Sequence, residues 1–338
     1  MQAGLRAPFH AIGGDAMLRL DSLSLANLCK AYAAGARPSE LVAAIYDRIC
    51  SAAIGPAWIH LRPREEALRA CAEIETRSAA RQSLPLFGVP FGVKDNIDVA
   101  GMPTTAACPA FSYTPERSAR SVELLLAAGG VCLGKTNLDQ FATGLSGTRS
   151  PYGACGAVGN PLYVSGGSSS GSAVVVATGL VSFALGTDTG GSGRIPAGFN
   201  GIIGIKPTVG RISTRGLVPN CPTLDCVSVF ALSIDDGTQV LTVIEGFDVD
   251  DQFSRPAVAP GHVGALRAVS LWGARTARLR VVRHARVRPD LRGGVRAALS
   301  SRRSANRDRL CAVPGGGPDV IRRALDRRAA CSARTVHQ

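Results

Sequence analysis

Two short clusters of glycine and serine are the stretches of this sequence whose composition is most typical of a catalytic site. The first reads Gly-Gly-Ser-Ser-Ser-Gly-Ser over residues 166–172, and the second reads Thr-Asp-Thr-Gly-Gly-Ser-Gly-Arg over residues 187–194. Glycine permits positive φ angles and close approach, so such loops can aim consecutive backbone N–H groups at one point. The pattern predicts a pocket for an anion or for an oxyanion.

Two familiar uses of such loops are excluded by the neighbouring residues. A phosphate-binding loop requires lysine after its last glycine, but Gly171 is followed by Ser172. A hydrolase nucleophile elbow requires G-x-S-x-G, but residues 190–194 place Arg194 where the last glycine belongs. A serine nucleophile also needs a proton acceptor, and the only histidine between residues 11 and 261 is His60, in an apolar run where a structural role is favoured.

Lysine is the other possible base, and the chain has four: Lys30, Lys94, Lys135 and Lys206. Lys94 follows the apolar run of residues 86–93, and burial there would lower its pKa from about 10.4 toward neutrality, as a lysine base requires. The alternative is an ion pair with Asp95 or Asp98 at a strand end. The residues alone leave both interpretations open, whereas Lys135 and Lys206 are interpreted as strand-end lysines.

Three separated motifs together resemble the amidase signature family of serine hydrolases. They are residues 92–96 (Gly-Val-Lys-Asp-Asn), residues 166–172 and residues 188–196 (Asp-Thr-Gly-Gly-Ser-Gly-Arg-Ile-Pro), in the family's order. The resemblance implies a Ser-cisSer-Lys triad. In it Ser192 is the nucleophile, Ser168 is the bridging serine on a cis peptide and Lys94 is the base.

The resemblance also implies an oxyanion site, and the residues themselves indicate how the glycine loops are held. Four backbone N–H groups would hold the oxyanion, those of Thr189, Gly190, Gly191 and Ser192. No metal or organic cofactor is implied. Asp139 and Asp188 are expected to anchor the glycine loops, and Arg194 is expected to tie down its own loop.

Further stretches, at residues 135–144, 218–228 and 253–256, resemble the allophanate hydrolases within this family. The resemblance covers about residues 22–257 and implies hydrolysis of a small amide substrate, allophanate (urea-1-carboxylate), to ammonia and carbon dioxide, by a homodimer. Two alternatives remain: another amidase of the family, and the glutaminase subunit of an amidotransferase. A third, of another class, is a non-catalytic product with a basic tail that binds nucleic acid.

The alternation of helices and apolar strands predicts an α/β fold with a largely parallel sheet covered on both faces. The family resemblance implies an α/β/α sandwich around a mixed, largely parallel sheet that is incomplete at the C-terminus. Helices are predicted at residues 22–34, 38–51, 64–81 and 118–128, and strands at 57–61, 87–93 and 130–137. No apolar run of membrane-spanning length and no leader of the secretory kind is visible, which predicts a cytoplasmic protein without a membrane partner. Ten scattered cysteines predict reduced thiols rather than a zinc site or disulfides.

The formal net charge of +13 is concentrated at one end of the chain. Residues 1–260 carry 20 basic and 21 acidic side chains, whereas residues 261–338 carry 18 arginines and 4 aspartates. We therefore predict a leader over residues 1–21, a catalytic domain over 22–260 that is truncated relative to the family, and an atypical tail over 261–338. The tail lacks Lys, Glu, Phe and Tyr, which is typical of disordered or out-of-frame sequence, and nucleic-acid binding is disfavoured.

Overall fold

The structure is a computed structural model of the chain, and it describes residues 9–13, 16–20, 22–52, 55–80 and 83–256. The tail predicted over residues 261–338 lies outside these residues, and so do residues 257–260 at the end of the predicted catalytic domain. All the elements described below precede residue 257.

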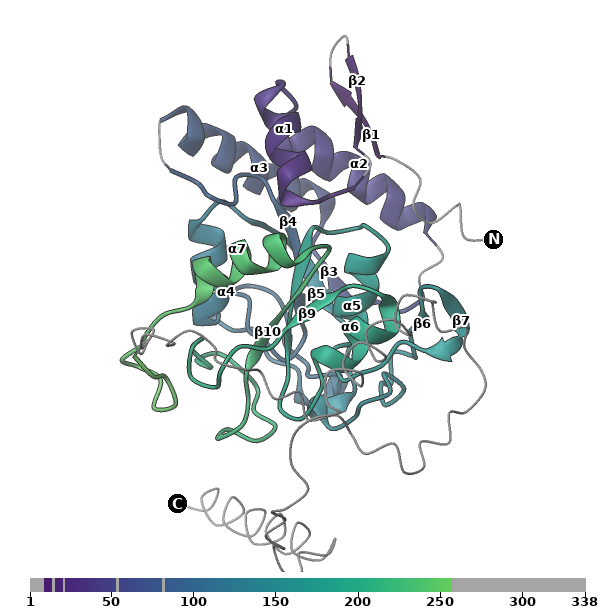
Figure 1. Ribbon diagram of the computed structural model, residues 1–338, viewed down its shortest axis with the longest axis vertical. Coiled ribbons are helices and arrows are strands. Elements are labelled where there is room, and N and C mark those ends of the chain that lie inside the picture. The colour runs from purple at the N-terminus through teal and green to yellow at the C-terminus, as the bar shows by residue number, and fades with distance from the viewer. Residues whose placement is uncertain (1–8, 14–15, 21, 53–54, 81–82, 257–338) are drawn as a thin grey trace, which may run out of the picture. The chain divides into compact units, whose positions relative to one another are not determined.

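A six-stranded mixed sheet forms the centre of the fold (Figure 1). Its order is β3-β5-β4-β8-β10-β9, in which β5, β4 and β8 run parallel and the other pairings are antiparallel. The strands span Trp58–Leu61 (β3), Pro90–Lys94 (β4), Val131–Thr136 (β5), Phe183–Thr187 (β8), Ile203–Ile205 (β9) and Val227–Ala231 (β10). The predicted fold class is confirmed, with the parallel part limited to the three central strands.

Helices cover both faces of this sheet. In Figure 1, α5 and α6 lie on one side of it, and α4 and α7 lie on the other. The helices span Leu25–Ala33 (α1), Pro38–Ser51 (α2), Arg64–Ala79 (α3), Arg120–Ala127 (α4), Ser170–Ala177 (α5), Arg194–Asn200 (α6) and Ile234–Ile244 (α7). The predicted helices in the first half of the chain correspond to α1 to α4. Helix α5 is buried from Ser170 to Val176, which agrees with its lack of a polar face.

The first described residues form a β-hairpin within the segment predicted as a leader. Phe9–Gly13 (β1) and Ala16–Leu20 (β2) pair as an antiparallel hairpin. The segment contains two adjacent glycines, Gly13 and Gly14, between two apolar-rich runs, which is a hairpin signal that composition alone obscures. A second small hairpin joins Gly156–Ala157 (β6) to Asn160–Val164 (β7).

Packing at the centre of the sheet fixes where the strands end. Phe91 of β4 stacks on Phe183 of β8, with ring centroids 5.1 Å apart, and both side chains are fully buried. Because β4 and β8 are parallel, their carboxyl ends meet at the same edge of the sheet, where the chain leaves β4 at Lys94 and β8 at Thr187. The neighbouring strand β5 ends beside them at Thr136.

Candidate active site

Lys94 lies at this edge and is fully buried. Its Nζ is 2.7 Å from Ser168 Oγ and 2.7 Å from Thr187 Oγ1. Asp95 is instead ion-paired with Lys135, at 3.0 Å, and Asp98 accepts a hydrogen bond from Tyr113. Among the described residues, the partners of the Lys94 amine are therefore two hydroxyls and no carboxylate, so the ion-pair interpretation of Lys94 is wrong.

Burial determines the protonation of this lysine. Loss of hydration lowers the pKa of Lys94 from 10.5 to about 7, and the negative charges of Asp139, Asp225 and Asp188 act in the opposite direction. A large share of the amine is therefore neutral at neutral pH. A neutral amine can accept a proton, which an ammonium group cannot do.

Ser168 lies in the first glycine-serine loop, just before α5, and is fully buried. The peptide bond between Gly167 and Ser168 is cis. The loop is held by the segment after β5: the Asp139 N–H donates to the Ser168 carbonyl (3.0 Å), and the Gly171 N–H donates to the Asn137 carbonyl (2.9 Å). The Asp139 carboxylate accepts N–H groups of the facing segment, residues 147–149, so the hydrogen bond of Asp139 to the glycine loop comes from its backbone and not from its side chain.

Ser192 lies in the second loop, which connects β8 to α6, and is buried apart from 4% of its surface. The Ser169 N–H donates to the Ser192 carbonyl (3.3 Å), so the two loops lie side by side. The structure thus brings the second loop against the first, beside Lys94. Within the described residues, however, no hydrogen bond joins the Ser192 and Ser168 hydroxyls.

The second loop is fixed by a carboxylate clamp. Asp188 accepts hydrogen bonds from the N–H groups of Gly191 (2.7 Å), Gly193 (3.1 Å) and Arg194 (3.1 Å), and from the Arg194 guanidinium at 2.9 and 3.0 Å. Burial alone would raise the pKa of Asp188, but the bonds from Arg194 and from the backbone lower it to about 2. The anchoring roles predicted for Asp188 and Arg194 are confirmed.

The clamp corrects one part of the predicted oxyanion site. The N–H of Gly191 is already donated to Asp188, so it is not available to an oxyanion in this conformation. The N–H groups of Thr189, Gly190 and Ser192 make no hydrogen bond with any other described residue. Three of the four predicted donors are therefore free in the described part of the chain, and Gly190 lies at an open position with no atom within 4 Å of an added Cβ.

Some residues at the site were missed by sequence analysis. Thr187 bonds Lys94, and it also accepts a hydrogen bond from the Asn96 side-chain amide at 3.3 Å. Asp225, which is 36 residues beyond Thr189 in the chain, accepts a hydrogen bond from its hydroxyl. Thr187 and Asn96 are within two residues of predicted site residues and could have been inferred, whereas nothing local in the sequence identifies Asp225.

Other predicted residues lie away from this chemistry or have a structural role. His60 is in β3, where burial and then the charge of Lys135 lower its pKa. Lys135 is the residue before the end of β5, and it bonds Asp95 and Thr104. The described residues contain no cluster of three or more His, Cys, Asp or Glu side chains able to hold a metal ion. No helix among them is long and apolar enough to cross a membrane.

A buried lysine at the edge of a mixed β-sheet, beside two serine-containing loops, is an arrangement that suits a serine hydrolase. Comparison with known sequences identifies the family of the chain. The sequence model of the amidase family matches residues 40–306, so this chain belongs to the amidase family. The urea amidolyase of Saccharomyces cerevisiae is 51% identical over 221 residues, which are 65% of this chain and 12% of that protein.

Two further proteins are similar to more than two thirds of this chain. The solved structure of Kluyveromyces lactis allophanate hydrolase is 49% identical, with a TM-score of 0.65, over 69% of this chain and 39% of that one. A glutamyl-tRNA(Gln) amidotransferase subunit of Akkermansia muciniphila is 43% identical over 230 residues, which are 68% of this chain and 47% of that one. The chain thus spans less than half the length of each of these relatives.

Proposed function

We propose that this protein is an amide hydrolase that cleaves allophanate to ammonia and carbon dioxide. The single observation that carries the proposal is the hydrogen bond between Lys94 Nζ and Ser168 Oγ, made by a buried amine whose pKa is lowered to about 7. About half of the residues are identical to those of allophanate hydrolase and urea amidolyase over the aligned part, which supports this substrate.

The proposed mechanism is a proton relay. Neutral Lys94 takes a proton from Ser168, Ser168 takes one from Ser192, and Ser192 Oγ attacks the amide carbonyl. This step requires a hydrogen bond between the Ser192 and Ser168 hydroxyls, which is not formed among the described residues. The relay run in reverse protonates the leaving nitrogen, the C–N bond breaks, and water then hydrolyses the acyl-enzyme. No cofactor takes part.

The oxyanion that forms in this reaction would be held by the free N–H groups of Thr189, Gly190 and Ser192. Loss of one such donor typically costs about 10²–10³ in rate. The Asp188 clamp supports this assignment, because it fixes the loop before substrate arrives and so leaves little reorganisation for the reaction to drive.

The domain boundaries and the assembly are part of the proposal. We assign catalysis to residues 22–260, with residues 1–21 as a leading segment and 261–338 as a separate tail. The protein is proposed to act in the cytoplasm as a homodimer on a small amide. The relationship to the amidotransferase protein favours one other function, glutamine hydrolysis in a complex.

The test is ammonia release from freshly prepared allophanate, with glutamine and a small carboxamide assayed alongside. We expect turnover of allophanate by the full chain and none by Ser192→Ala. Turnover of glutamine but not of allophanate would refute the proposed substrate and leave the proposed active site unchanged. Turnover that survives in Ser192→Ala would refute the assignment of Ser192 as the nucleophile.

A further inference from the structure

Asp225 is a buried carboxylate that the proposed mechanism does not use. It is 4% exposed and lies in the loop that leads into β10. It accepts hydrogen bonds from the Thr189 hydroxyl (2.5 Å) and from the N–H groups of Asn220 (2.9 Å) and Cys221 (3.0 Å). The only one of these partners that belongs to the catalytic loop is Thr189.

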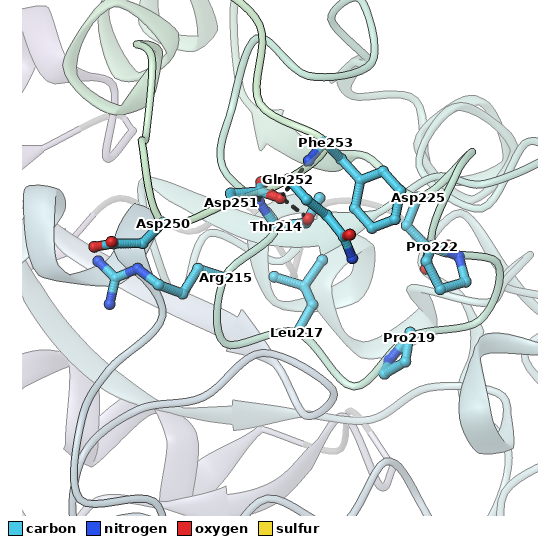
Figure 2. Close-up of a pocket in the computed structure, with 10 residues that line it drawn as sticks. All are labelled: Thr214, Arg215, Leu217, Pro219, Pro222, Asp225, Asp250, Asp251, Gln252 and Phe253. Carbon is cyan, nitrogen blue, oxygen red and sulfur yellow. Dashed lines mark hydrogen bonds between the residues drawn. The ribbon is translucent and has the colours of Figure 1, made fainter. Parts of the chain in front are cut away.

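The surroundings of Asp225 leave its carboxylate committed to these partners. It forms part of the wall of a cavity of about 360 Å³, shown in Figure 2, where Asp251 bonds Thr214 and the Phe253 N–H. The loop itself is held in place from another side, because the Asn220 side chain donates to the Phe141 carbonyl (3.0 Å).

The second glycine loop is therefore held at two points by two different carboxylates. Asp188 binds the N–H groups of Gly191, Gly193 and Arg194, which form the later half of the loop. Nothing in that clamp touches Thr189, which is half-buried and precedes the exposed Gly190. The hydroxyl bond to Asp225 is the side-chain hydrogen bond that holds Thr189 itself.

We propose that Asp225 is a positioning residue that holds Thr189, through its hydroxyl, so that the Thr189 N–H points at the oxyanion. The inference rests on the proposed function, since it assigns the bond a role in the same reaction. Fixed donors contribute to catalysis because they do not have to be reoriented when charge develops on the oxygen.

A merely structural Asp225 would hold only its own loop, through Asn220 and Cys221, and variants of Thr189 separate the two roles. Thr189→Val removes the hydroxyl while keeping the size of the side chain and the backbone N–H, and Thr189→Ser keeps the hydroxyl. We expect Thr189→Val to lower kcat about 10- to 100-fold, with KM changed less than about twofold, because the bond serves the transition state. Thr189→Ser should recover most of the loss.

A double variant tests the coupling. If Asp225 acts through Thr189, Asp225→Ala combined with Thr189→Val should be no slower than Asp225→Ala alone, because both remove the same bond. Losses that multiply would overturn the proposal, and so would full kcat in Thr189→Val.

A second measurement separates this inference from the choice of substrate. A fluorophosphonate probe reacts with Ser192 itself: the Oγ–P bond forms, the P–F bond breaks and fluoride leaves. Slower labelling of Thr189→Val than of the native chain or Thr189→Ser supports the inference, whether or not allophanate is turned over. A lack of allophanate turnover refutes only the proposed substrate. Equal labelling rates for all three would overturn the inference.

Discussion

Two buried lysines at neighbouring strand ends have opposite surroundings. Lys94 ends β4 and Lys135 is the penultimate residue of β5, and both side chains are fully buried. Burial lowers the pKa of each. Lys135, however, is 3.0 Å from the carboxylate of Asp95, whose charge opposes the shift. The hydrogen-bond partners of Lys94 within the described ranges are both hydroxyls.

The partners of the two amines therefore explain how one edge of the sheet can carry both a structural lysine, Lys135, and a proposed reactive one, Lys94. A carboxylate in contact favours the charged form of an amine, because opposite charges attract, and so opposes the effect of burial. Hydroxyl partners leave the amine free to gain or lose its proton. The sequence places Asp95 next to Lys94, but the carboxylate points to the lysine of the adjacent strand.

The largest expected effect comes from removing the reactive lysine. Lys94→Met should lower kcat/KM about 10²–10⁴-fold, since the general base is lost. Its free energy of unfolding should rise, because burial of the amine lowers its pKa in the fold below the value in the unfolded chain, and such a group disfavours folding near pH 7. Turnover assays and urea unfolding check this prediction, and a native-like rate would show that Lys94 is not the base.

Removing the structural lysine should give the converse result. Lys135→Met leaves the buried Asp95 carboxylate unpaired, and we expect a loss of about 3–5 kcal/mol in the free energy of unfolding. Asp95→Asn combined with Lys135→Met is the control, and it should lose less because no unpaired charge remains. Urea unfolding of the three proteins measures the difference, and an unchanged stability for Lys135→Met would contradict the comparison.

The pH dependence sharpens the comparison without a mutation. A base acts when neutral, so kcat/KM should rise about tenfold per pH unit below the pKa of Lys94 and level off above about pH 7. The residual activity of Lys94→Met should lack this rise. A profile that still rises near pH 10 would mean that Lys94 keeps the pKa of an exposed lysine.

The smallest effect is expected at the Asp188 clamp, which pairs a carboxylate with an exposed arginine. Because the pKa of Asp188 is lowered to about 2 in the fold, its stabilisation is present above the unfolded pKa near 4 and is lost as pH falls toward 2. Arg194→Gln should raise the midpoint pH of acid unfolding and cost less than about 1 kcal/mol near neutrality, since 55% of the Arg194 side chain is exposed. Acid titration followed by circular dichroism measures the shift, with Arg194→Lys as the variant that keeps the charge. If the midpoint pH of acid unfolding of Arg194→Gln equals that of the native chain, the Asp188–Arg194 pair does not contribute to stability.

Much of the fold could be predicted from local patterns. Periodic apolar residues located α1 to α4, and Pro38 marked the start of α2. The hairpin of β1 and β2 was missed because its strands are short and the composition of the segment obscures the turn signal of its two adjacent glycines. The antiparallel pairing of β10 depends on long-range register, which no short window contains.

The site could be predicted as a set of residues but not as a set of bonds. The motifs located Lys94, Ser168 and Ser192 because they are local in sequence. The bond between Thr189 and Asp225, and the donation of the Gly191 N–H to Asp188, depend on how the loops pack. The partners of Lys94 likewise depend on packing, since they are hydroxyls of other segments of the chain and not the adjacent Asp95.

The enclosure of α5 has a practical consequence for genetics. This helix begins directly after the loop of Ser168, and an added Cβ on Gly171 would lie 2.3 Å from the Ala57 carbonyl. Nearly every single substitution from residue 168 to 176 should therefore fail in a saturation library, whether survival requires turnover or only soluble expression. Intolerance alone would mark the whole stretch alike, and only scoring abundance separately from activity would single out Ser168, the proposed bridging serine.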